Sequence, residues 1–515
     1  MNGKTDTRIE ECIEEHQVDA THATQSAWSG IYTVLGRLSN VLTQVGSTII
    51  LARLLEPDDF GLFAMMAAVA SLTPVVMDLG TRDVAVQKPR LTAGEVSALF
   101  WISVLIGIGF ALGVMMARSF IADFYHDTRL IDIAAVWTLT FLFSSLSLQH
   151  TALLRRAMRF DRLNIIEIGS NFVAAASAIF LAWRGIGYWA LVLRPIIASG
   201  LYTIGVWVSY PWRPGWPCPW ADVRSMLTLG GQITGFSLLD ALARSMDRIV
   251  LGRIGGASQV GYYNNGFNIY DNAIGIFGIP VHTVAVASLS KLRNMPEDLR
   301  HMWESGLQAL TFFAMPIFVV LAAVGQDIAV VLLGEQWRLA GELLWIIALR
   351  GPAHVIERSH GWLHVVGGHG DRWVRWGIIS CVVQLAAVAC GAPFGAVGIA
   401  VAGTIAIYLL FVPAIMFSAA PFGLGAKHLA RTVGPQLLGA LGTIVTMIMV
   451  REMYFVDLTS YERIAAVSFF SLIVYLVVTV GLFRVTKPLR YAWSLLQDKF
   501  RTGGPSSGDG LPCTN

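Results

Sequence analysis

Long uninterrupted runs of apolar residues constrain this chain more than any other feature. Bilayer hydrocarbon is spanned by roughly 20 apolar residues of helix, and runs of that length recur along the sequence, separated by short polar stretches. Only 14% of the residues are charged, against about 25% in an ordinary soluble domain. The sequence therefore predicts an all-α polytopic membrane protein with no room for a large soluble domain.

These apolar runs predict fourteen transmembrane helices, centred near residues 40, 69, 106, 140, 173, 197, 236, 274, 314, 350, 381, 405, 438 and 473. Basic residues are unevenly distributed over the alternating loops, with 21 Lys and Arg on one side and 8 on the other. By the positive-inside rule the richer side is cytoplasmic, which places both termini there. We expect a multi-pass protein of the cell inner membrane.

The sequence repeats itself at an offset of 200 residues. The identical pairs in this register include Leu38/Leu238, Leu42/Leu242, Ile49/Ile249, Leu51/Leu251, Arg53/Arg253 and Gly61/Gly261. The repeated unit holds six predicted helices. Because six is even, both copies enter the membrane in the same orientation and are related by an axis along the membrane normal, as in transporters that rock two halves about a central site.

The repeat predicts the domain organisation. Its parts are a polar cytoplasmic N-terminus (1–26), an N-terminal six-helix lobe (27–210), a Pro/Trp-rich linker (211–220), a C-terminal six-helix lobe (221–420), an additional helix pair (421–486) and a cytoplasmic tail (487–515). Pro and Trp suit a linker at the membrane interface. We therefore expect two pseudo-symmetric lobes followed by a C-terminal helix pair.

Four strings carry a family resemblance: "LARLLEPDDFGLFAMMAAV", "MDLGTRDVAVQ", "LLRRAMRFDRLN" and "DRIVLGRIGGASQVGYYNNGFNI". In this order and spacing they resemble the polysaccharide flippases of the multidrug/oligosaccharidyl-lipid/polysaccharide exporter superfamily, and in particular its Wzx-like branch. The likeness covers roughly residues 28 to 420. It implies a MATE-like bundle of two lobes, alternating access, and an undecaprenyl-pyrophosphate-linked oligosaccharide as the substrate for lipopolysaccharide, capsule or exopolysaccharide export.

A pyrophosphate anion and a polar glycan need a cationic, hydrogen-bonding cavity to cross hydrocarbon. On the predicted helix near residue 236, four charged residues follow the spacing of one helix face: Asp240, Arg244, Asp247 and Arg248. Charge at bilayer depth is costly unless it is paired or hydrated. We expect the two arginines to bind the pyrophosphate while the two aspartates hold them or couple protons. An internal ion-pair network that locks helix packing is the alternative.

Further candidates lie on other helices. Arg37 has no carboxylate within one turn of its own helix, which suits an anion site, although its side chain could snorkel to the interface instead. Arg350 joins the predicted cationic cavity. His354 and Glu357 are candidates for proton coupling on a helix that Pro352 should kink, and pairing of Glu357 with His354 or Arg358 is the alternative.

Amide and aromatic side chains near residue 268 could bind sugar hydroxyls and stack on sugar rings. The candidates are Tyr263, Asn265, Asn268 and Asp271. Asparagine also joins transmembrane helices through hydrogen bonds, and this alternative stays open.

Two other functions remain alternatives. A cation-coupled drug exporter belongs to the same superfamily but would favour an acidic cavity, and a membrane glycosyltransferase or polymerase could use the acidic pair Asp58 and Asp59. That pair lies where a helix should begin, and the matching position in the second copy, "GASQV", has no acid. We therefore expect a transporter and no enzyme.

We expect no cofactor, no metal and no nucleic-acid partner. The expected partners are the lipid-linked substrate, membrane lipids, and a polymerase with its export machinery. No P-loop motif is present, so the driving force would come from an ion gradient, the membrane potential or consumption of the product.

Overall fold

The computed structural model describes residues 22–78, 92–216 and 220–490, apart from the single residues 294, 369, 424 and 456. Most of these described residues are helical, and they include no β-strand. The chain forms two compact units, each assembled from three segments. Unit 1 comprises Met1–Phe267, Ala329–Leu343 and Gly377–Gly403, and unit 2 comprises Asn268–Ile328, Leu344–Trp376 and Thr404–Asn515.

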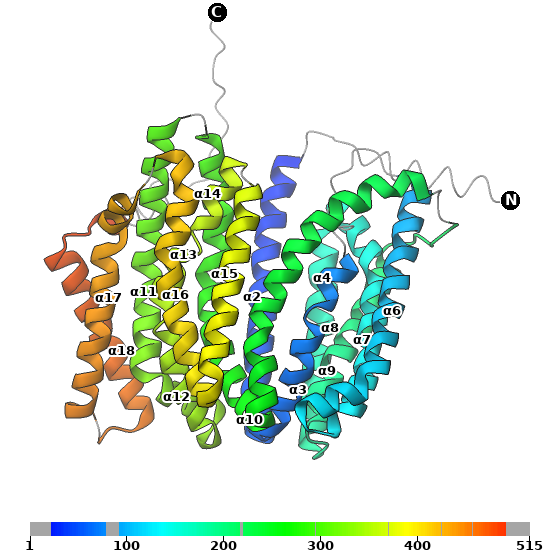
Figure 1. The fold of residues 1–515 in the computed structure, drawn as a ribbon, viewed down its shortest axis with the longest axis horizontal. Helices are drawn as coiled ribbons and strands as arrows, with labels where there is room; N and C mark the ends of the chain where they lie inside the picture. The colour runs from blue at the N-terminus through cyan, green and yellow to red at the C-terminus, as the bar shows by residue number, and fades with distance from the viewer. Residues whose placement is uncertain are drawn as a thin grey trace, which may run out of the picture. The chain divides into compact units, whose positions relative to one another are not determined.

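Unit 1 is built mainly from the first helices of the chain (Figure 1). They are α2 (His22–Leu54), α3 (Pro57–Ala70), α4 (Thr73–Asp78), α6 (Ala93–Tyr125), α7 (Arg129–Arg156), α8 (Phe160–Trp183), α9 (Trp189–Ser209) and the first part of α10 (Trp220–Lys291). Local signals set several ends. Thr92 and Glu95 form a capping box that starts α6, and Pro57 occupies the first turn of α3, where its missing N–H costs nothing.

Unit 2 contains the rest of α10 and the C-terminal helices. These are α11 (Pro296–Leu333), α13 (Gly351–Glu357), α14 (His360–Gly367), α17 (Ala426–Tyr454), α18 (Ser460–Leu476) and the π-helical segment η4 (Val477–Leu482). The helices α12 (Arg338–Ala348), α15 (Gly370–Gly391) and α16 (Gly395–Ala419) contribute residues to both units, as do α10 and α11.

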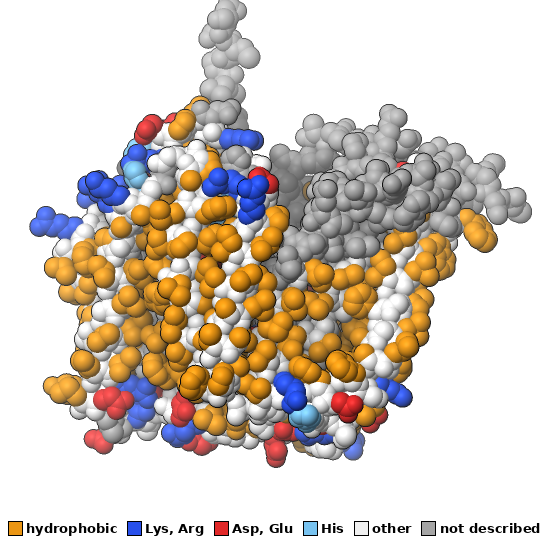
Figure 2. Space-filling model, viewed as in Figure 1, with side chains coloured by type: hydrophobic (Ala, Val, Ile, Leu, Met, Phe, Trp, Pro, Cys, Tyr) orange, Lys and Arg blue, Asp and Glu red, His pale blue; other side chains and the backbone are white. Residues whose placement is uncertain are grey.

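The sides of the helices expose large apolar side chains, the reverse of a soluble protein. Met116, Phe120 and Val208 are 85%, 72% and 80% exposed. Figure 2 shows apolar side chains along the helices and charged side chains gathered at their ends. Within the described residues, eight helices are long and apolar enough to cross a membrane, or nine if the bent pair Glu335–Ala348 and Gly351–Gly367 is one span. The chain is a multi-pass membrane protein.

The predicted helix centres agree with the structure except at one point. Every centre lies inside a helix apart from residue 350, which lies at the junction of α12 and α13. The axes bend there by 49°, and Pro352 stands at the start of α13, so the predicted kink is confirmed. The seventh and eighth centres share α10, which breaks at Gly256 because this residue has φ +73°.

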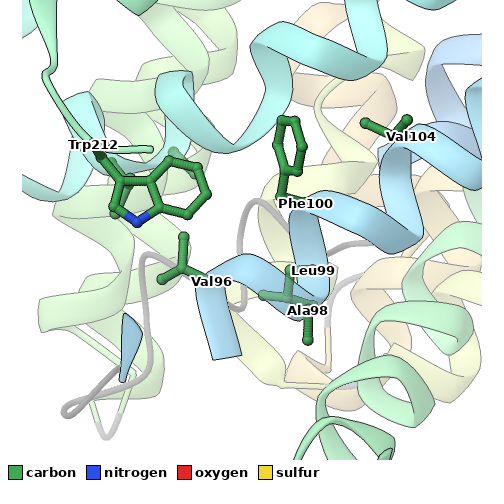
Figure 3. Packing of buried hydrophobic residues seen from close by; sticks show 8 residues of the cluster. Val96, Ala98, Leu99, Phe100, Val104 and Trp212 are labelled. Carbon is green, nitrogen blue, oxygen red and sulfur yellow. The ribbon is translucent and has the colours of Figure 1, made fainter. Parts of the chain in front are cut away.

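The first half of the Pro/Trp-rich linker packs against α6 within unit 1. Trp212 is buried among Val96, Phe100 and their neighbours on α6 (Figure 3). The indole N–H of Trp101 donates to the carbonyl oxygen of Gly215 over 3.1 Å, whereas Trp216 is 94% exposed. This segment is therefore held to α6 through Trp212, whereas its Trp216 side chain is exposed.

Candidate functional site

The carboxylate of Asp247 lies on the first part of α10 and is bound by its own helical hairpin. The Tyr263 hydroxyl donates to Asp247 Oδ2 over 2.9 Å, and the backbone N–H of Arg248 donates to Oδ1 over 2.8 Å. Tyr263 comes after the break at Gly256, so the chain reverses and brings its ring back against α10. Asp247 is thereby positioned by neutral donors.

Arg248 has a different environment. Its guanidinium lies over the ring of Phe267, 5.0 Å from the centroid, and Nη1 donates to the backbone carbonyl oxygen of Arg244 over 3.3 Å. Its Nε is buried and, among the described residues, has no hydrogen-bond partner. The cation therefore lies on an aromatic face, and its Nε–H has no acceptor among the described residues.

The other charged residues predicted on this helix face are either exposed or have side chains outside the described residues. Arg244 is exposed. The side chains of Arg37 and Asp240 lie outside the described residues, although the backbone at both positions is helical. Ser245, one residue after Arg244, is buried, and its Oγ lies 2.7 Å from Ser71 Oγ at the end of α3. This hydroxyl pair joins α10 to the α3 segment within unit 1.

Arg350 and His354 belong to unit 2, where they meet a tyrosine. The Tyr270 hydroxyl lies 2.6 Å from His354 Nδ1, and the two rings stack at an interplanar angle of 21°. The guanidinium carbon of Arg350 lies 5.9 Å from the centroid of the same tyrosine ring. Tyr270 is fully buried and Arg350 is nearly so. The predicted cation and the predicted relay histidine thus contact one buried ring.

Glu357 has a partner that the sequence analysis did not name. His360 Nδ1 lies 3.5 Å from Glu357 Oε1 and 2.6 Å from the backbone carbonyl oxygen of the same residue. Both side chains are largely buried. The turn between α13 and α14 brings His360 back onto Glu357, and the proton-coupling role of Glu357 and His354, like the alternative pairing of Glu357 with His354 or Arg358, stays a prediction.

The four residues predicted to contact the glycan differ in their exposure. Tyr263 and Asn265 are buried, Tyr263 bound to Asp247 and Asn265 donating to the backbone carbonyl oxygen of Gly261 over 3.4 Å. Asn268 is half-buried and Asp271 is exposed. The buried pair satisfies bonds within α10, so the residues with accessible polar groups are Asn268 and Asp271.

The acidic pair that suggested an enzyme is engaged in local structure. Asp59 accepts a hydrogen bond from the backbone N–H of Glu56 over 3.2 Å and closes the capping box of α3. Asp58 pairs with Arg129 over 2.7 Å and accepts a hydrogen bond from Ser258 over 3.2 Å. The helix start expected at this pair is confirmed, with Glu56 as the N-cap residue.

Sequence reasoning missed a buried ion cluster in unit 2. Asp327 on α11 is 4% exposed; Arg463 Nη1 lies 2.9 Å from its Oδ1 and Arg451 Nη2 lies 3.5 Å from its Oδ2. Arg451 also donates to the carbonyl oxygen of Ala323, and Arg463 to that of Phe455. No local signal predicts this cluster, because its members lie on α11, α17 and α18, far apart in sequence.

The fold is similar to the folds of two solved membrane proteins. It is similar to the lipid II flippase MurJ in an inward closed conformation, with a TM-score of 0.72, 13% identity and coverage of 88% of this chain and 99% of the other. It is also similar to an inward-facing MATE family multidrug transporter of the MOP superfamily, with a TM-score of 0.56, 13% identity and coverage of 75% and 94%. The predicted MATE-like fold is confirmed.

The family follows from the sequence comparison. The family described as "Polysaccharide biosynthesis protein" matches residues 50–341, so the chain belongs to this family. It is 22% identical over 357 residues to an uncharacterized membrane protein in the cps region of Klebsiella pneumoniae, covering 68% of this chain and 73% of the relative. It is 22% identical over 379 residues to the lipopolysaccharide biosynthesis protein WzxC of Escherichia coli strain K12, covering 72% and 75%.

Proposed function

We propose that this protein moves a polyprenyl-pyrophosphate-linked oligosaccharide from the cytoplasmic to the periplasmic leaflet of the inner membrane by alternating access. The product would supply lipopolysaccharide O-antigen, capsule or exopolysaccharide synthesis. Membership of the polysaccharide biosynthesis family and the MurJ-like fold support this function. The excess of basic residues on one set of loops supports cytoplasmic termini.

Arg248 is the residue that we propose binds the pyrophosphate. A pyrophosphate presents charged oxygens that accept hydrogen bonds from a guanidinium. The buried Nε of Arg248 has no acceptor in the described structure, and the Phe267 ring supports the planar cation from one side. Such a group binds an anion more strongly than a guanidinium already neutralised by a carboxylate. Arg244, one turn away on α10, would add a second cation at the exposed side.

Transport without covalent chemistry is the second part of the proposal. The capping box and ion pair that engage Asp59 and Asp58 support it, since a general base needs a carboxylate that can receive a substrate proton. Polar groups with outward access, Asn268 and Asp271, would contact the sugars. A polymerase and export machinery would take the product on the periplasmic side.

Reconstitution into liposomes tests the function directly. The protein is incorporated with a fluorescent undecaprenyl-pyrophosphate oligosaccharide, and the lipid that reaches the opposite leaflet is measured by quenching from outside. The expected result is protein-dependent exchange of the labelled lipid, while a small organic dye cation in parallel vesicles stays where it was loaded. Transport of the dye cation with no movement of the lipid under any imposed gradient would instead favour a drug exporter.

A further inference from the structure

Arginines gather at one end of unit 1, where α7 ends, α8 begins and α9 runs into the Pro/Trp-rich linker. Leu154, Leu163 and Val206, one from each of these helices, pack into a single buried cluster. This packing brings to the same end the arginines that lie close to it in sequence, namely Arg155, Arg156, Arg159, Arg162 and Arg213. Arg156 is half-buried and has an interaction of its own. We refer to the other four, which are exposed, as the arginine rim.

The linker is fixed to this end of the helices. Trp212 is 3% exposed and belongs to the same buried cluster as Leu153 of α7 (Figure 3). Its carbonyl oxygen lies 3.3 Å from Nε2 of His150, also on α7. The residues that follow Trp212 are therefore held beside the ends of α7 and α8.

Two members of the rim are positioned by uncharged groups. The guanidinium carbon of Arg213 lies 5.6 Å from the centroid of the Trp207 ring on α9. Arg162 Nη1 donates to the carbonyl oxygen of Ser209, the last residue of α9, over 3.0 Å. Both contacts leave the positive charge without a counter-ion.

The charge of the rim is not balanced by the protein that the structure describes. No described carboxylate forms an ion pair with any of the four arginines, and this includes Asp161, the exposed acid of the same segment. Other arginines near helix ends, such as Arg129, Arg300 and Arg375, each have a carboxylate oxygen within 4.0 Å. Cations gathered without a counter-ion repel one another. An anion from outside the protein would remove this repulsion.

Exposed apolar side chains accompany these charges. Met158, between α7 and α8, is 62% exposed and has φ 53°, a left-handed conformation that residues other than glycine seldom adopt. Trp216, in the linker anchored by Trp212, is 94% exposed. Water disfavours large apolar side chains, whereas the headgroup region of a bilayer favours both tryptophan and clustered arginine. The environment that suits the whole surface is therefore a layer of lipid headgroups.

We propose that the arginine rim, together with Met158 and Trp216, binds the phosphate headgroups of anionic phospholipids in the leaflet that it faces. A guanidinium binds phosphate oxygens through parallel N–H donors. Each arginine near an anionic bilayer surface adds about a fivefold gain in affinity. Weak contacts of this kind stay occupied because a leaflet supplies such lipids continuously. With the termini placed as proposed above, this leaflet is the cytoplasmic one.

Native mass spectrometry of the full chain in detergent tests the rim, with phosphatidylglycerol and zwitterionic phosphatidylcholine as the probes. Arg155→Gln combined with Arg159→Gln should raise the Kd for phosphatidylglycerol about 25-fold, a factor of about five for each charge. Binding of phosphatidylcholine should not change. The matched control, Arg118→Gln combined with Arg184→Gln, removes the same charge from exposed positions at the other ends of α6 and α8. It should change the Kd less than about twofold, because isolated exposed charges are screened.

A conservative pair separates lipid binding from damage to the fold. Arg155→Lys combined with Arg159→Lys keeps both charges and should hold the Kd within about threefold of the wild type. All variants should keep the wild-type melting midpoint in lipid-free detergent. A loss of binding that accompanies a lower midpoint would make the two arginines structural and overturn the proposal.

Other outcomes would also overturn the rim. An equal loss in both glutamine pairs would indicate general attraction to a cationic protein, and no loss in either pair would leave the rim without a ligand. A larger loss of affinity for undecaprenyl pyrophosphate than for phosphatidylglycerol would make the rim a contact for the transported lipid. Because the phosphatidylglycerol titration uses no transported substrate, its result is independent of the flippase assay.

Discussion

Asp327 on α11 and Asp247 on α10 are both helix carboxylates near arginines, yet their surroundings differ. Two guanidiniums, from Arg451 and Arg463, contact the Asp327 carboxylate directly. The Asp247 carboxylate is held by the Tyr263 hydroxyl and a backbone N–H, while the guanidinium of the adjacent Arg248 turns to the Phe267 ring. At the first cluster the carboxylate is held by two guanidiniums of the protein, whereas at the second the Nε–H of Arg248 has no acceptor among the described residues.

The difference separates a structural charge cluster from a candidate binding site. The Asp327 carboxylate ties α17 and α18 to α11 through Arg451 and Arg463, so removing it leaves two partly buried guanidiniums uncompensated. A buried N–H donor without an acceptor destabilises the protein, and a ligand that supplies an acceptor removes this penalty. Substitutions at the first cluster should therefore change stability, and substitutions of Arg248 should change binding.

The largest effect is expected at Asp327. Replacing it by alanine leaves two partly buried arginines without their carboxylate, which should lower the free energy of unfolding by about 3 kcal/mol. The thermal midpoint in detergent, followed by fluorescence-detected size exclusion, measures this loss. Asp371→Ala is the matched control, since its pair with Arg375 is exposed. Equal midpoints for both variants would remove the distinction drawn here.

A smaller loss should follow from Tyr263→Phe. This substitution keeps the ring and removes the hydroxyl that donates to Asp247, leaving a half-buried carboxylate oxygen without that bond. We expect a loss of about 2 kcal/mol in the free energy of unfolding. Tyr461→Phe, on an exposed ring, serves as the control. No change in the midpoint for Tyr263→Phe would mean that Asp247 is positioned by its backbone partner alone.

Arg248→Ala should weaken anion binding with little effect on stability. Loss of a charge-assisted hydrogen bond predicts a Kd for undecaprenyl pyrophosphate that is about tenfold larger, equivalent to about 1.4 kcal/mol. Binding of the labelled lipid in detergent measures it, with Arg118→Ala as the control because Arg118 lies on the exposed side of α6. Unchanged affinity together with a large fall in the melting midpoint would make Arg248 a structural residue.

The smallest effect concerns the partly exposed pair of Asp127 and Arg129, which follows α6. Burial raises the pKa of Asp127, but the hydrogen bonds and charge of Arg129 outweigh it and hold the pKa below the ordinary value of 3.8. The pair therefore stabilises the fold above about pH 4, and this contribution disappears as the pH falls through the lowered pKa. Asp127→Asn should remove under about 1 kcal/mol of this acid-sensitive stability. The difference between the melting midpoints of the two proteins should be larger at about pH 6 than at about pH 3, because the contribution is lost as the pH falls through the lowered pKa.

Much of the fold could be predicted from the sequence because the bilayer imposes one simple rule. Every span needs a long apolar run, and such runs located α6, α8, α9 and α17 without any tertiary information. The 200-residue register was also visible, since burial follows it: Leu51 and Leu251 are both fully buried, while Leu54 and Ile254 are both exposed. The apolar runs and the repeat can both be read from the order of residue types along the chain.

Side-chain partners could not be predicted in the same way. Tyr263 reaches Asp247 only because the chain reverses at Gly256, and Glu357 finds His360 because α14 follows a tight turn after α13. Helical spacing placed Arg244 and Arg248 near each other but said nothing of the Phe267 ring, which comes from the second part of α10. Partners that depend on reversal of the chain require three-dimensional coordinates.

The central claim is that an anion-binding arginine on α10 serves the passage of a lipid-linked oligosaccharide. The most direct measurement is the rate of leaflet exchange in liposomes for the wild type, Arg248→Ala and Arg118→Ala, at equal protein incorporation. We predict rapid exchange for the wild type and for Arg118→Ala. For Arg248→Ala we predict an exchange rate that is lower by a factor of about ten. Equal rates for all three proteins would contradict the account.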